Sequence, residues 1–103
     1  MLDFGLKAEV VSAISEVLSR YPEVEKALIY GSRVKGNYRN GSDIDLTLVG
    51  DININRLGAV SIELDDLLLP YTFDLSIYQH IANKDLIDHI ERIGVDFYTK
   101  SRA

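Results

Sequence analysis

Two short segments of this chain alternate apolar and polar residues with a strict period of two, and a helical pattern separates them. In residues 43–49, isoleucine and leucine alternate with aspartate and threonine, and residues 73–78 repeat the alternation. Successive side chains of a β-strand point to opposite faces, so each segment is predicted to be a strand with one buried and one polar face. Leucine and valine at three-and-four spacing predict a helix over 57–68 between them.

The rest of the chain predicts two further helices and two further strands. In chain order these are a helix over 6–21 that Pro22 ends, a buried strand over 26–30, a helix over 83–93 that Gly94 ends, and a short closing strand over 95–98. No repeat or linker divides the sequence. The predicted fold class is therefore α/β (α+β), a small mixed sheet flanked by helices in one domain spanning residues 1–103.

Composition excludes several classes of protein. Sixteen acidic residues against eleven basic ones give a net charge of -5, which argues against broad, sequence-independent binding to nucleic acid. The absence of cysteine excludes disulfides, thiolate metal sites and cysteine nucleophiles. No apolar run approaches the roughly 20 residues of a membrane span, and the N-terminus lacks the pattern of a signal peptide. We expect a cytoplasmic protein that does not enter the membrane.

The polar face of the first alternating strand carries two carboxylates, Asp43 and Asp45. Residues two apart on a strand project from the same face, roughly 6–7 Å apart at the backbone. Their negative charges repel each other, and a hard cation such as magnesium would reverse that repulsion. The alternative is that both side chains belong to the solvated face of an edge strand.

Asp74 lies near the start of the second alternating strand. If the two strands pair, they lie about 4.8 Å apart, and Asp74 joins Asp43 and Asp45 on one face. Three carboxylates at one place suit a two-metal centre, in which the metals clamp the attacking and leaving oxygens. The chain is then predicted to bind two magnesium ions through these three aspartates.

A turn that begins with Gly31 and Ser32 is a candidate phosphate site. A strand that ends at Gly-Ser and turns into a short helix leaves backbone N–H groups free, and glycine lets a phosphate approach the backbone closely. An ordinary turn is the alternative. Gly31 and Gly36 have the spacing of a P-loop, but Asn37 and Tyr38 follow where lysine and serine or threonine are required.

Three cations follow this turn within seven residues, at Arg33, Lys35 and Arg39. Such a cluster in an acidic chain suits neutralisation of a triphosphate. Arg33 lies nearest the turn and is the predicted nucleotide-binding cation. A solvated loop is the alternative for each of the three.

Gly31-Ser32, followed ten residues later by Ser42-Asp43-Ile44-Asp45-Leu46, resembles the signature of the DNA polymerase beta-like nucleotidyltransferase superfamily. The length resembles that of its minimal nucleotidyltransferase (MNT) branch, whose members are often encoded beside HEPN-domain proteins. The resemblance implies that Gly31 and Ser32 hold the phosphates of ATP and that Asp43, Asp45 and Asp74 bind magnesium. It also implies a HEPN-domain partner, joined with this chain in a hetero-oligomer.

The predicted function is a magnesium-dependent nucleotidyltransferase. The resemblance implies transfer of AMP from ATP to a hydroxyl group, a tyrosine of the HEPN toxin, by the antitoxin of a type VII-like toxin–antitoxin pair. Asp43 and Asp45 hold the metal that bridges the triphosphate, and Asp74 helps to bind a second metal and to activate the acceptor. The alternative is a catalytically weak binding module that neutralises a toxin by stoichiometric complex formation.

Overall fold

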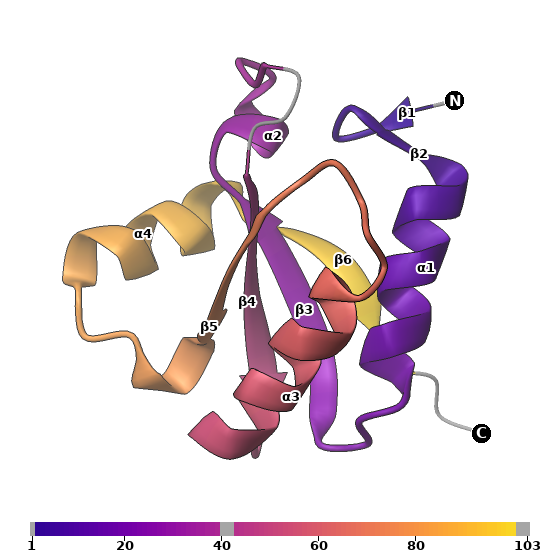
Figure 1. The fold of residues 1–103 in the computed structure, drawn as a ribbon. Helices are drawn as coiled ribbons and strands as arrows, with labels where there is room; N and C mark the ends of the chain where they lie inside the picture. The colour runs from indigo at the N-terminus through magenta and orange to yellow at the C-terminus, as the bar shows by residue number, and fades with distance from the viewer. Residues whose placement is uncertain (1, 40–42, 101–103) are drawn as a thin grey trace.

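A four-stranded sheet forms the centre of the fold in the computed structural model, which describes residues 2–39 and 43–100 (Figure 1). The strand order is β5-β4-β3-β6, with bounds β3 Val24–Tyr30, β4 Ile44–Gly50, β5 Phe73–Ile77 and β6 Val95–Thr99. β3 pairs antiparallel with both β4 and β6, whereas β4 and β5 are parallel. The sheet is therefore mixed, as predicted.

Helices cover both faces of this sheet. Helices α1 (Ala8–Ser19) and α3 (Ile54–Asp65) lie together on one face, and α4 (Lys84–Ile93) lies on the other (Figure 1). The short helix α2 (Ser32–Lys35) follows β3 directly, and the 3-10 turn η1 (Tyr78–His80) follows β5. No helix in the described ranges has the length and apolar character needed to cross a membrane.

The main core lies between the sheet and helices α1 and α3. The apolar face of β4 is completely buried there, because period-two alternation turns Ile44, Leu46 and Leu48 toward the helices. Ile90 of α4 is buried too but is not a member of this cluster, which agrees with the position of α4 on the opposite face. The other fully buried side chains include Leu6, Ile14, Leu18, Val24, Ala27, Ile29, Val60 and Leu64.

The N-terminal end differs from its prediction. The helix predicted from residue 6 begins at Ala8, because residues 6–7 form strand β2 (Leu6–Lys7) and pair with β1 (Leu2–Asp3). Phe4 and Gly5 form the two-residue turn between them, with φ angles of 58° and 73°. Positive φ at both central residues matches the turn that a tight hairpin needs.

Helix α3 begins and ends three residues earlier than predicted. The Asn53 side chain caps its start by accepting a hydrogen bond from the Arg56 backbone N–H at 2.9 Å. Leu68, predicted as the last helical residue, has a positive φ of 55° and is 88% exposed, so it lies in the loop that leads to β5. The remaining predicted elements agree with the structure to within two residues.

Candidate active site

Asp45 and Asp74 lie directly opposite each other on the parallel strands β4 and β5. Residues in register on adjacent strands share a face of the sheet, at a strand spacing of about 4.8 Å. The neighbouring pairs in the same register, Ile44 with Phe73 and Leu46 with Leu75, point to the opposite face. The predicted pairing of the two alternating strands is therefore confirmed, and it brings two carboxylates together.

The environment of Asp45 disfavours its negative charge. Burial, together with the negative charges of Asp74 and Asp43, raises the pKa of this carboxyl from 3.8 to about 6. The nearby Arg33 guanidinium lowers the pKa but does not outweigh the other effects. A half-buried carboxylate surrounded by like charge is a common feature of sites that bind a cation or exchange a proton.

Asp43 lies at the same end of the sheet but is turned toward a different partner. It is exposed, immediately precedes β4, and accepts a short hydrogen bond from the Thr72 hydroxyl. The Ile44 backbone N–H donates to the Thr72 carbonyl oxygen at 2.9 Å. Thr72, which immediately precedes β5, therefore forms hydrogen bonds with both Asp43 and Ile44, the first residue of β4.

The three predicted carboxylates do not form a ready-made metal cage. Within residues 2–39 and 43–100, no group of three acidic, histidine or cysteine side chains converges closely enough to enclose an ion. Magnesium, however, is commonly bound through one or two carboxylates together with substrate phosphates. The opposed pair Asp45 and Asp74, with Asp43 beside it, fits that kind of donor set.

Gly31 packs against the Asp45 carboxylate. It lies between β3 and α2 with φ 80°, and its carbonyl oxygen accepts from the backbone N–H groups of Val34 and Lys35 at 3.2 and 3.1 Å. A side chain at position 31 would collide with Oδ2 of Asp45. Both the positive φ and this close approach require glycine. The predicted phosphate turn and the predicted metal site are therefore adjacent, with Ser32 half-buried at the start of α2.

Arg33 is placed differently from the other predicted site residues. Its side chain is 3% exposed, and its guanidinium lies 5.1 Å from the ring centre of Tyr38 and 4.8 Å from that of Tyr71. Its Nη1 donates to the Phe4 carbonyl oxygen at 2.9 Å. Lys35 and Arg39, by contrast, are exposed. The cation nearest the turn is thus buried in the protein against two aromatic rings.

Sequence reasoning missed a set of hydroxyl groups beside the two carboxylates. Ser76 donates to Thr47 at 2.9 Å, and each lies two residues after a site aspartate on the same face of the sheet. Tyr30, opposite Asp45 in register, is buried; burial raises its pKa, the charges of Asp74 and Asp45 raise it further, and a hydrogen bond with Ser76 lowers it. The period of two already places Thr47 and Ser76 on the same face as the aspartates, but nothing in the sequence marks them as site residues.

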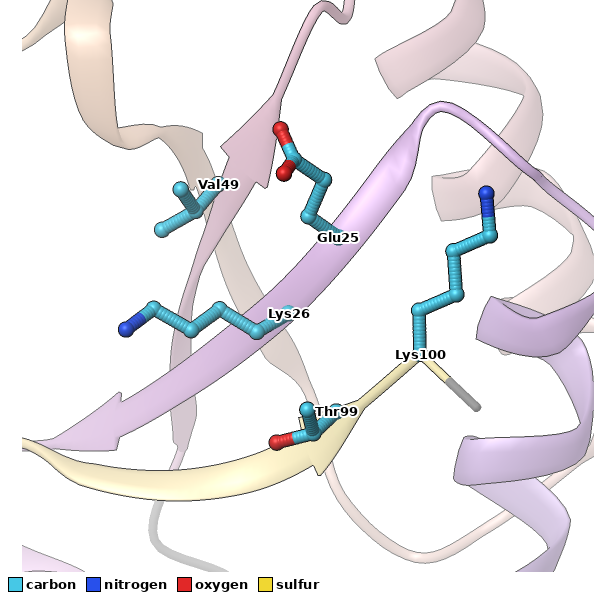
Figure 2. A pocket seen from close by; sticks show the side chains of 5 residues that line it. All are labelled: Glu25, Lys26, Val49, Thr99 and Lys100. Atoms are coloured by element: carbon cyan, nitrogen blue, oxygen red, sulfur yellow. The ribbon is translucent and has the colours of Figure 1, made fainter. Parts of the chain in front are cut away.

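Among the hollows formed by the described residues, two lie at the sheet. One, of about 480 Å³, is lined by Glu25, Lys26, Val49, Thr99 and Lys100, and Figure 2 shows the two lysines pointing in different directions. It lies at the far end of β3 from the carboxylates. The other, of about 410 Å³, runs between α3 and β5 and includes Asp74 among its lining residues.

Comparison with known proteins adds a family and a fold. The family model described as "Polymerase beta, Nucleotidyltransferase" matches residues 12–103. A crystal structure of a toxin–antitoxin with AMP-PNP is similar at 18% identity and a TM-score of 0.71, over 88% of this chain and 74% of that one. A crystal structure of the toxin–antitoxin MntA-HepT is similar at 15% identity and 0.67, over 91% and 74%. No curated protein matches in a sequence comparison.

At these identities the solved structures establish the fold, which agrees with the mixed sheet and the flanking helices described above. Gly31, Ser32, Asp43, Asp45 and Asp74 all lie within the matched range. Ser42, part of the signature in the sequence, lies outside the described residues.

Proposed function

Because this chain belongs to the polymerase beta nucleotidyltransferase family, we propose that it transfers AMP from ATP to a hydroxyl group, with Asp43, Asp45 and Asp74 as its catalytic and metal-binding residues. The observation that carries the proposal is the opposition of Asp45 and Asp74 in register, with the Gly31 turn directly against Asp45. A phosphate held at the turn lies beside two carboxylates that share a face of the sheet.

The reaction exchanges one phosphorus–oxygen bond for another. The acceptor oxygen attacks the α-phosphorus of ATP, the bond to the oxygen that bridges to the β-phosphorus breaks, and pyrophosphate leaves. The proton of the acceptor hydroxyl passes to Asp74, which is exposed and therefore open to an incoming acceptor.

Magnesium, when bound, neutralises the phosphate charge and polarises the reacting oxygens. Asp43, Asp45 and Asp74 would hold it, in a two-ion arrangement that the phosphates of ATP complete. The raised pKa of Asp45 supports this role, since a cation at the site would favour the charged form that burial and the neighbouring carboxylates disfavour.

Gly31 and Ser32 would bind the nucleotide phosphates. The backbone of Gly31 can approach a phosphate without obstruction, and the Ser32 hydroxyl can donate to one. The buried charge of Arg33, close enough to lower the pKa of Asp45, favours an anion at the same place.

We further propose that the acceptor is a tyrosine of a HEPN-domain toxin, that the two proteins form a hetero-oligomer in the cytoplasm, and that the transfer makes this chain an antitoxin. The support is the resemblance of the signature to the MNT branch and the fold that the chain shares with toxin–antitoxin structures, one of which contains AMP-PNP. The rival is a binding module that inhibits the toxin by contact alone.

Turnover separates the two. One molecule of a transferase should inactivate many partner molecules when ATP and magnesium are supplied, and the partner should remain inactive after separation and carry the added mass of AMP. A binding module should inhibit in a one-to-one ratio without ATP. Intact mass spectrometry of the proposed HEPN-domain partner, mixed in large molar excess over this chain, distinguishes the two. An unmodified mass with full one-to-one inhibition in the absence of ATP would overturn the transferase.

A further inference from the structure

Arg33 connects three segments that are distant in the sequence. It belongs to α2, it donates to the Phe4 carbonyl oxygen in the N-terminal hairpin at 2.9 Å, and its guanidinium lies 4.8 Å from the ring centre of Tyr71, just before β5. Figure 1 shows the hairpin, α2 and the segment entering β5 gathered at one end of the sheet. That end carries Asp43, Asp45 and Asp74.

The hairpin side of this connection has a second contact. The guanidinium of Arg33 also lies 5.1 Å from the ring centre of Tyr38. The same ring packs so closely on Gly5 that a side chain at position 5 would collide with it. Gly5 has φ 73° and forms the hairpin turn with Phe4. The hairpin thus touches both Arg33 and Tyr38, three residues after the end of α2. The hairpin itself lies outside the range matched by the family, residues 12–103.

The β5 side leads directly to the carboxylates. Thr72, next to Tyr71, donates to Asp43 and accepts from the backbone N–H of Ile44. One ring contact and two hydrogen bonds therefore link the cation of α2 to the start of β4. The turn that ends in α2 and the strand that bears Asp45 are held in one arrangement through residues 71–72.

We propose that Arg33 is a positioning residue that fixes the Gly31 turn relative to the three aspartates by joining α2 to the N-terminal hairpin and to Tyr71. The nature of the ligand, ATP with magnesium, rests on the proposed function; the joining of the three segments does not. An arginine that is 3% exposed and in contact with two aromatic rings has little freedom to follow a substrate. Its guanidinium plane suits aromatic stacking, which lysine reproduces poorly.

The first test needs no nucleotide. Amide hydrogen exchange of the full chain should show faster exchange in α2, at the N–H groups of Val34, Lys35 and Gly36 that donate to Gly31 and Ser32 carbonyls. We expect at least a tenfold acceleration in Arg33→Met and Tyr71→Leu, relative to the amides of α4. Tyr71→Phe keeps the ring and should restore the wild-type rate.

A matched control exists elsewhere in the chain. The Arg56 guanidinium lies 4.7 Å from the ring centre of Tyr21, at the start of α3 and far from α2 (Figure 1). Unlike Arg33 it is exposed, and it also pairs with Glu23. Arg56→Met should therefore leave exchange in α2 unchanged relative to α4. Acceleration in α2 by this control as large as that by Arg33→Met would overturn the proposal, since it would show a general loss of stability.

The second test is calorimetric titration with ATP and magnesium. Arg33→Met and Tyr71→Leu should both weaken binding at least tenfold, while Tyr71→Phe and Arg56→Met bind as wild type does. Loss of affinity in Arg33→Met alone, with Tyr71→Leu normal in both binding and exchange, would make Arg33 a direct phosphate ligand and overturn the proposal. Should Arg33→Met fail to fold, the two Tyr71 variants decide. If the wild-type protein binds no ATP, the proposed function fails. Amide hydrogen exchange alone then tests the positioning role of Arg33.

Discussion

The α-carbon of Gly31 lies so close to the Asp45 carboxylate that any side chain at position 31 would meet Oδ2. Gly31 directly follows β3, whose last residue, Tyr30, lies opposite Asp45 on the neighbouring strand β4. The turn and the carboxylate therefore form one structural unit, in which a change at either residue displaces the other.

Gly31→Ala should disturb that unit, and Gly36→Ala provides the matched control. Both glycines have positive φ, at 80° and 85°, but a side chain at position 36 would meet no atom within 4 Å. Gly36→Ala should lower the free energy of unfolding only by the backbone strain, about 1–2 kcal/mol. Gly31→Ala should lower the free energy of unfolding by more than this, as measured by denaturant unfolding. It should also abolish binding of ATP with magnesium, as measured by calorimetry. Equal affinities for the two variants would contradict the placement of the phosphates at Gly31.

Asp45→Asn should stabilise the metal-free protein above neutral pH. The folded-state pKa of about 6 lies above the ordinary 3.8, so between these values the folded state binds more protons than the unfolded state, and stability falls as pH rises. The loss is complete above the folded pKa. We expect the free energy of unfolding of the variant to exceed that of wild type by on the order of 1–3 kcal/mol at neutral pH and above. This difference should shrink toward pH 4.

Urea unfolding in a chelating buffer, at several pH values, measures this difference. Asp51→Asn is the control, because Asp51 is exposed just beyond the other end of β4. A constant difference between Asp45→Asn and wild type across the pH range would show that burial and neighbouring charges do not govern the ionisation of Asp45.

The site was predictable where the sequence pattern is local. The alternation of residues 43–49 and 73–78 predicted two strands that the structure places within one residue of those bounds. Both segments have one apolar face, and both faces pack on the same core, so the strands pair with these faces on the same side of the sheet. Asp45 therefore lies opposite Asp74 on the other side.

The position of Arg33 could not be predicted in the same way. Its contacts come from Phe4, Tyr38 and Tyr71, and only the assembled fold brings them together. A cation in a polar segment gives no local sign that it will be buried. The N-terminal hairpin was missed for a related reason: the buried side chain of Leu6 fits the helical spacing as well as it fits a strand, and the turn depends on positive φ at Phe4.

Asp43→Asn combined with Asp45→Asn should abolish transfer of AMP while the protein stays folded. Removing both charges takes away two of the proposed metal ligands, and it also removes a half-buried charge at position 45 and the repulsion among the three carboxylates. Radiolabelled ATP with the HEPN-domain partner measures transfer, and circular dichroism measures folding. Full transfer by the double variant would remove these residues from catalysis, and unfolding would reveal a structural role instead.

Thr72→Val should weaken the site through Asp43 alone. The Thr72 hydroxyl donates to the Asp43 carboxylate, and valine has nearly the same shape without the hydroxyl. Because both side chains are exposed, the lost hydrogen bond should cost only about 1 kcal/mol, or roughly fivefold in affinity for ATP with magnesium. Thr72→Ser keeps a hydroxyl and should bind as wild type does, whereas Thr99→Val, an exposed threonine on β6, is the control for loss of a hydroxyl elsewhere. Equal affinities of Thr72→Val and Thr99→Val for ATP with magnesium would show that the hydrogen bond from Thr72 to Asp43 does not contribute to binding.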